Sequence, residues 1–190
     1  MITLRADELK RAEVALAHIK DGAAKAAMEA LNTSANEAKK KAVLKVKETY
    51  DVKSTNDGNI KEKGAVNIIR LQKATLQNLN AYVMSSGSRI PLIRFSVRPN
   101  NMPKKQTPVI VSVKRSGGTP LKHAFITRVK SSHIGVFERV GLPRLPIKQL
   151  HGPSLPQMLG ESKVSAYIEE EAQKLLDVNL DKAINRLMEG

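Results

Sequence analysis

Residues 123–140 read HAFITRVKSSHIGVFERV, and the expected fold follows from this stretch. Apolar, β-branched and aromatic residues alternate roughly with polar ones on both sides of KSSHIG, which is typical of two strands joined by a hairpin loop. Similar short runs precede it, namely AYVMS at 81–85, IPLIRFSVR at 90–98 and PVIVSVKRS at 108–116. Residues 65–141 are therefore predicted to form one antiparallel β-sheet of about five to six strands.

Helical patterns flank the predicted sheet. Residues 1–50 contain no proline, and apolar residues recur at spacings of three and four, so we expect one long N-terminal helix. Gly22 and Asn32–Asn36 are the points where this helix is expected to bend or break. Residues 161–189 repeat the pattern and predict a C-terminal helix. Two helices packed on the sheet give an α+β fold, with residues 1–190 forming a single domain.

A proline-rich segment, residues 142–160, separates the sheet from the C-terminal helix. Its prolines at 143, 146, 153 and 156 favour an extended strap without regular structure, laid over the sheet edge. Proline lowers the entropy lost on binding, so the strap is a candidate docking edge for a neighbouring subunit. The alternative is that it only covers its own sheet edge. The candidate inter-subunit residues are Arg139, Arg144, Gly152, Pro153 and Ser154.

Composition excludes several classes of chemistry. The chain has no cysteine and no tryptophan, and its four histidines share no metal-ligand spacing, so no metal site is predicted. Phosphate-binding glycine motifs and a nucleophile elbow are also absent from the sequence. We therefore expect no catalysis, no cofactor and no small-molecule substrate. No apolar run approaches the roughly 20 residues that cross a bilayer, so no membrane partner is expected.

Positive charge is concentrated in the middle of the chain. The net charge is +14, and residues 89–151 hold 13 basic side chains against one acid, whereas residues 152–190 hold four against seven. A basic segment of this kind attracts DNA or an acidic protein surface, although it is also typical of the solvated face of a half-buried sheet. The candidate basic surface comprises Arg94, Arg98, Lys104, Lys105, Lys114, Arg115 and Lys122.

Two stretches together resemble the minor tail protein Z family of tailed bacteriophages and prophages. They are IIRLQKATLQNLNAYVMSSGSRIPLIRF at 68–95 and HAFITRVKSSHIGVFERVGLPRLPIKQLHGPSLPQML at 123–159. The resemblance rests on the order and spacing of several short motifs. These are Arg89, Pro91 and Leu92; Ala124, Phe125 and Ile126; Val136, Phe137 and Arg139; Arg144, Pro146 and Ile147; and Gly152, Pro153, Ser154 and Pro156.

The resemblance implies a structural tail-completion subunit. Such a subunit would form a homo-oligomeric ring at the head-proximal end of the tail, contact neighbouring tail and neck proteins, and touch packaged DNA without sequence preference. It would be made in the bacterial host cytoplasm and end in the virion tail or neck. Two alternatives stay open: a tail terminator or head–tail adaptor, and, in another class, a non-specific nucleic-acid-binding protein.

Overall fold

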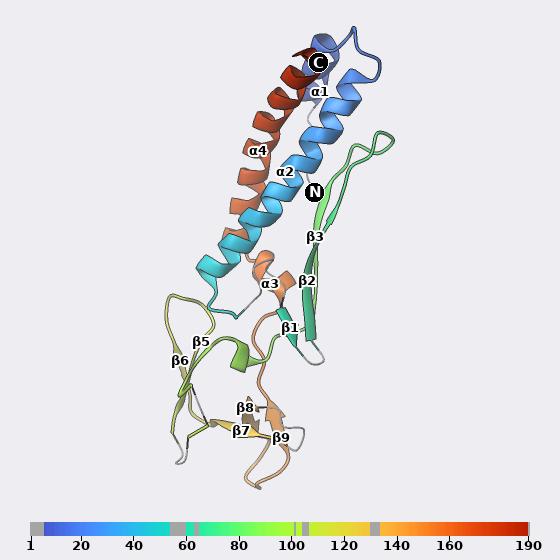
Figure 1. The fold of residues 1–190 in the computed structure, drawn as a ribbon. Coiled ribbons are helices and arrows are strands. Elements are labelled where there is room, and N and C mark those ends of the chain that lie inside the picture. Colours follow the sequence, from blue (N-terminus) through green and yellow to red (C-terminus); the bar gives the residue numbers. More distant parts are fainter. Residues whose placement is uncertain are drawn as a thin grey trace. The chain divides into compact units, whose positions relative to one another are not determined.

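The computed structural model describes residues 6–53, 60–62, 65–100, 102–103, 107–129 and 134–189. Figure 1 shows the order of the elements along the chain. The helices are α1 (Ala6–Ala15), α2 (Gly22–Thr49), the 3-10 turn η1 (Leu92–Arg94), α3 (Leu155–Leu159) and α4 (Ser162–Glu189). The strands are β1 (Ile60–Glu62), β2 (Ala65–Gln72), β3 (Tyr82–Ser86), β4 (Ser96–Arg98), β5 (Val109–Ser112), β6 (Thr119–Leu121), β7 (Ala124–Arg128), β8 (Ile134–Arg139) and β9 (Ile147–Gln149).

The fold is α+β, as the sequence predicts, but the described strands form three small sheets in place of one. Their orders are β1-β2-β3, β4-β5-β6 and β7-β8-β9, with antiparallel pairing throughout the registers observed. The hairpin predicted from residues 123–140 is confirmed, because β7 and β8 pair from Ala124 opposite Glu138 to Arg128 opposite Ile134. Residues 130–133 of its predicted loop lie outside the described part of the chain.

One predicted strand is shorter than expected. IPLIRFSVR contains the turn η1, in which the Arg94 amide donates to the Pro91 carbonyl at 2.9 Å and the Phe95 amide donates to the Leu92 carbonyl at 3.0 Å. Only Ser96–Arg98 pairs as a strand. Pro91 has no amide hydrogen to offer a sheet, which favours a turn at this point.

The chain divides into two compact units. We call Met1–Leu44, Ile69–Ser85 and Leu159–Gly190 the helical unit, and Lys45–Ile68 and Ser86–Met158 the sheet unit. Helix α2 and strand β2 each have residues in both units. The assignment of the whole chain to one domain stays a prediction.

The long N-terminal helix expected over residues 1–50 is broken at one of the two points where a break is predicted. Helix α1 ends at Ala15, Asp21 has a left-handed φ of 56°, and α2 starts at Gly22. Gly22 is one of the predicted weak points, and a Cβ there would lie 2.9 Å from the Leu16 Cβ. Close return of the chain onto Leu16 therefore requires a residue without a side chain.

The other predicted weak point, Asn32–Asn36, stays helical because its polar groups have partners. The Asn32 amide group donates to the Ala74 carbonyl at 3.1 Å, and its Oδ1 accepts from the Ala74 amide at 2.7 Å. Ser34, which is fully buried, accepts a hydrogen bond from Asn179 at 3.1 Å. Polar side chains that find tertiary partners no longer compete with the helix backbone.

Small residues build the core of the helical unit. Helices α2 and α4 lie side by side in Figure 1, and alanines on α2 meet leucines on α4. Residues of α1 and of the segment that includes β2 and β3 join the same cluster, so the helices pack on this hairpin as expected. The buried members are Ala12, Leu16, Ala26, Ala30, Leu31, Ala35, Ala74, Ala81, Leu176, Leu180, Ala183 and Ile184. Alanine lets two helix backbones approach closely while still burying apolar surface.

The proline-rich strap contains regular structure, contrary to expectation. Ile147–Gln149 forms β9 on the edge of β8, and Leu155–Leu159 forms α3. Ser154 and Gln157 make a capping box, in which the Ser154 amide donates to Gln157 Oε1 at 2.9 Å and the Gln157 amide donates to Ser154 Oγ at 3.4 Å. Pro156 lies in the first turn of α3, where a helix has no use for the missing amide hydrogen.

Candidate interaction surfaces

The Gly152–Pro153–Ser154 turn makes its described contacts within its own chain. The Gly152 amide donates to the Ile90 carbonyl at 2.7 Å, and a Cβ at Gly152 would lie 2.7 Å from Cε2 of Phe95. Phe95 is fully buried, and Ser154 is 7% exposed. These contacts hold the strap on the segment around η1, and a subunit contact through the turn stays a prediction.

A buried asparagine on β2, which the sequence reasoning missed, fixes the start of α3. Asn67 is fully buried, and its Oδ1 accepts a hydrogen bond from the Leu155 amide at 3.0 Å. The chain also passes so close at Gly87 that a Cβ there would lie 2.0 Å from the same oxygen. The signal for this residue was available, because an asparagine inside the apolar run AVNIIRL is the residue that needs a buried partner.

Arg139 and Arg144, the other two candidate contact residues, are both exposed. The Arg139 guanidinium lies 6.0 Å from the centre of the Phe125 ring, on the partner strand β7. Arg144 belongs to the loop between β8 and β9, and three apolar side chains in the same loop are also open to solvent: Val140, Leu142 and Leu145. The sequence reasoning selected the arginines of this region and overlooked its exposed leucines.

Two residues of the candidate basic surface hold the C-terminal end of α2. Arg115 donates through Nε to the Lys47 carbonyl at 2.7 Å and through its backbone amide to the Thr49 carbonyl at 3.1 Å. The Lys114 ammonium lies 5.8 Å from the centre of the Tyr50 ring. Cations at this position satisfy the last carbonyls of a helix and the negative end of its dipole. Both side chains therefore have a role in the fold as well as a positive charge.

The remaining candidates of the basic surface are distributed over the sheet unit. Arg98 is exposed at the end of β4, Lys122 is exposed in the turn between β6 and β7, and Arg94 is half-buried at the end of η1. Lys104 and Lys105 lie outside the described residues. Lys114 and Arg115 are exposed as well, but their side chains contact the end of α2, so we take Arg98 and Lys122 as the candidates for a partner.

The two units differ strongly in charge. Over their full residue ranges, the sheet unit carries a formal net charge of +13 and the helical unit +1. A field of this strength steers polyanions and acidic surfaces toward the sheet unit. The charge difference along the sequence thus coincides with the division of the fold.

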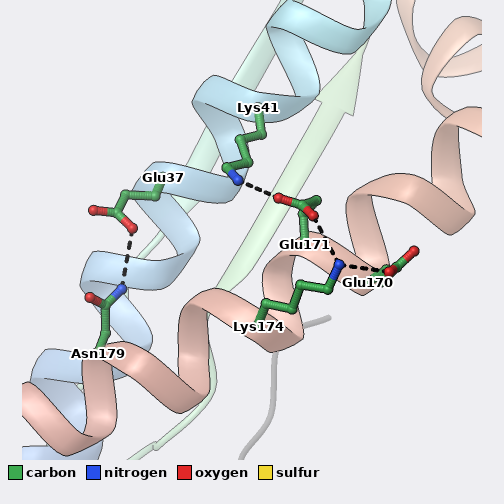
Figure 2. A network of polar contacts seen from close by, with 6 residues as sticks. All are labelled: Glu37, Lys41, Glu170, Glu171, Lys174 and Asn179. Atoms are coloured by element: carbon green, nitrogen blue, oxygen red, sulfur yellow. Dashed lines mark hydrogen bonds and ion pairs between the residues drawn. The ribbon is translucent and has the colours of Figure 1, made fainter.

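Ion pairs and hydrogen bonds connect α4 to α2 and α1, and Glu170 and Glu171 also pair with Lys174 within α4. Figure 2 shows Lys41 and Lys174 both directed at Glu171, and Lys174 also pairs with Glu170 at 2.7 Å. Asn179 donates to Glu37 at 3.3 Å in the same view. Two further pairs, Arg11 with Asp181 and Arg186 with Glu29, connect α4 to α1 and α2.

This network shifts the pKa values of its members in opposite directions. The hydrogen bond from Lys41 lowers the pKa of the Glu171 carboxyl, and burial opposes that effect. The bond to Glu171 raises the pKa of Lys41, and bonds to Glu170 and Glu171 raise the pKa of Lys174. Both charged states are favoured because each group has an opposite charge beside it. The contacts fix the register of α4 on α2.

The described residues show neither a candidate metal cluster nor a candidate membrane-spanning helix. They contain no group of three or more histidine, aspartate or glutamate side chains placed to hold a metal ion. None of the described helices combines the length and the apolar character that crossing a membrane requires.

Comparison with known families identifies the chain. Residues 8–189 match the family described as prophage minor tail protein Z. The chain belongs to this family. The resemblance drawn from the motifs at 68–95 and 123–159 is thereby confirmed, and it extends over both units and almost the whole chain. Neither the curated proteins nor the solved structures contain a match to the chain.

Membership in the minor tail protein Z family establishes the general role. The chain is a phage minor tail protein, its place is the virion tail, and its partners are other tail proteins. The basic sheet unit and the exposed loop between β8 and β9 are the candidate surfaces for contacts with these proteins.

Proposed function

We propose that this subunit acts at the head-proximal end of the tail, where it completes the tail so that a head can join. The observation that carries the proposal is the match of residues 8–189 to the minor tail protein Z family. The subunit would work as a homo-oligomeric ring in contact with neighbouring tail and neck proteins. It would assemble in the host cytoplasm and remain in the virion.

The charge distribution supports this place in the particle. A sheet unit with a net charge of +13 fits a position beside packaged DNA or beside an acidic neck protein. Exposed Arg98 and Lys122 are the described side chains proposed for that contact. Non-specific contact with the DNA end would neutralise phosphates without reading bases.

The proposed role is structural, and no step of it needs catalysis. The apolar faces of α2 and α4 are buried against each other, so neither helix offers its main apolar face to a neighbour. Contacts between subunits would instead use exposed loops and charged surfaces, including Arg139 and Arg144. Gly152, Pro153 and Ser154 would support such a contact by holding the strap in place.

Electron microscopy of particles from a strain lacking this gene tests the proposal. We expect tails of normal length that fail to join heads, or that join without producing infectious particles. Overlong or ragged tails would instead assign the subunit as a tail terminator, and filled heads lacking a joined tail with an unoccupied portal would favour a head–tail adaptor. Intact, infectious particles would refute a role in the virion.

Direct nucleic-acid binding is the alternative that the charge of the sheet unit favours. It predicts an affinity for duplex DNA that falls steeply with salt, because each neutralised phosphate releases counterions. Binding weaker than about 1 µM at physiological salt, measured by fluorescence anisotropy, would argue against an independent DNA-binding function, since non-specific affinities of that order or weaker are common among basic proteins.

A further inference from the structure

An exposed apolar loop projects between β8 and β9. We call residues 140–146 the tip loop; its ends are joined by the pairing of Arg139 with Ile147 and by a hydrogen bond from the Val140 amide to the Pro146 carbonyl at 3.1 Å. Leu142 is 98% exposed, Leu145 66% and Val140 65%. Three large apolar side chains gathered on one short loop are typical of a surface that another molecule covers.

The construction of the tip loop favours insertion into a groove. Its closed base limits the conformations of the backbone, and Pro143 and Pro146 restrict it further. Little conformational freedom is then lost when the loop binds, which favours affinity. Arg144 stands among the apolar side chains and supplies a single charge that can fix the orientation of the bound loop.

The helical unit contains a groove with both apolar and charged walls. The α1–α4 groove is lined by Val14, Ala15 and Ile184, and by the polar residues Asp7, Lys10, Arg11, Asp181 and Asn185, and its volume is about 620 Å³. Val14 is 74% exposed, whereas Ala12 on the same helix is fully buried in the core of the helical unit. Clefts of about 300–1,000 Å³ hold drug-sized molecules, so the groove has room for the side chains of a loop tip.

The proposed ring makes a second copy of the chain the occupant, and charge sets the orientation of that copy. Two sheet units, each at +13, repel each other, whereas the helical unit at +1 does not repel a sheet unit strongly. In the groove, Asp181 is already paired with Arg11, whereas Asp7 forms no ion pair with any described residue. Asp7 is therefore the acid available to an incoming Arg144, next to Lys10 on the same wall.

We infer that the tip loop of one subunit inserts into the α1–α4 groove of the next. Leu142 and Leu145 cover Val14, Ala15 and Ile184, and Arg144 pairs with Asp7. The contact is head-to-tail, because the loop and the groove are different surfaces, and repeated head-to-tail contacts generate rings when the rotation closes. The inference rests on the proposed function, since it names the contact by which the minor tail subunit would form its ring.

Disulfide trapping tests the contact directly, because the chain has no native cysteine. Val14→Cys chains are mixed with Leu142→Cys chains under mild oxidation, at about 0.5 M NaCl, where the electrostatic screening length falls to roughly 4 Å. We expect a disulfide-linked heterodimer on a non-reducing gel, and a ladder of multimers from the double variant. Leu44→Cys replaces Val14→Cys as the matched control, because Leu44 is 59% exposed on α2. A heterodimer no more abundant than in this control overturns the inference.

A second experiment separates the contact from the function. Leu142→Glu and Val14→Glu both change exposed side chains, so both variants should melt like the wild type. In the double-cysteine variant those two positions are occupied by the cysteines, so Leu145→Glu is used there and should abolish the ladder. Co-flotation of wild type, but not of Leu142→Glu, with phosphatidylglycerol vesicles and without any heterodimer would overturn the inference in favour of a lipid surface. If heterodimers form but the deletion strain yields infectious particles, the proposed function fails and the contact stands.

Discussion

Replacing Gly152 by alanine tests whether the strap turn serves the fold or a subunit contact. The added Cβ would lie 2.7 Å from Phe95 Cε2, 3.0 Å from Cζ and 3.3 Å from Leu92 Cδ2. Carbon atoms in contact prefer about 3.5–4.0 Å, so the buried ring would have to move by roughly 0.8 Å. Overpacking of this kind costs about 1–3 kcal/mol. At 2–4 °C per kcal/mol for a chain of this length, the melting temperature should fall by about 2–12 °C.

Urea unfolding followed by circular dichroism measures the effect, with Gly117→Ala as the matched control. A Cβ at Gly117 meets nothing within 4 Å, so alanine there should be neutral or slightly stabilising. Phe95→Leu combined with Gly152→Ala should recover part of the loss, because the smaller side chain gives the methyl group room. If Gly152→Ala unfolds with the same free energy as Gly117→Ala, the packing argument is wrong. Unchanged stability with failed tail assembly would point to a subunit contact at the turn.

Three further predictions concern single side chains. Because the pKa of Glu171 is lowered, the contribution of its ionised form to stability is present above the ordinary carboxyl pKa of 4.5 and is lost as the pH falls through the lowered pKa. The difference in unfolding free energy between wild type and Glu171→Gln should therefore shrink between pH 7 and pH 2. A constant difference would contradict the assignment. Ser154→Ala removes the cap of α3 and should lower the unfolding free energy by about 0.5–2 kcal/mol, whereas Ser154→Asp should retain most of it. Arg98→Ala should weaken the binding of duplex DNA and reduce its salt dependence without changing the melting temperature. Arg115→Ala should lower the melting temperature, because the Lys47 carbonyl at the end of α2 loses its side-chain donor. The reverse pattern would exchange the roles of the two arginines.

Local patterns were sufficient where a structural element depends on its own residues. The hairpin of β7 and β8 follows from alternation around a short loop, and α4 begins and ends within about one residue of the predicted 161–189. The break before α2 falls at Gly22 because the missing side chain that weakens a helix also permits a close turn. Helix α3 was also readable, since SLPQ at 154–157 combines a capping box with a proline in the first helical turn.

Local sequence patterns could not predict which distant segments pair with one another. The division of the strands into three sheets depends on which strands meet in space, and the turn η1 inside IPLIRFSVR forms beside residues far along the chain, as the bond from the Leu92 amide to the Leu150 carbonyl shows. The same holds for the candidate surfaces. Nothing near Arg115 in the sequence indicates that its guanidinium binds the C-terminal end of α2, more than sixty residues earlier in the chain. Exposure of Leu142 likewise depends on how the hairpin is closed.

The concentration of charge on one of the two units has a consequence for the timing of assembly. Whenever several copies gather around one axis, every added sheet unit brings a further +13, and the electrostatic work of adding the next copy grows with the number already present. At physiological salt, fields are screened beyond about 8 Å, so the penalty acts only between copies that are nearly touching. If the proposed ring forms, its growth is expected to be more favourable where phosphates or carboxylates of another component cancel the charge. Under the proposed function, an unfinished tail or a DNA end would then be the place where assembly is most favourable.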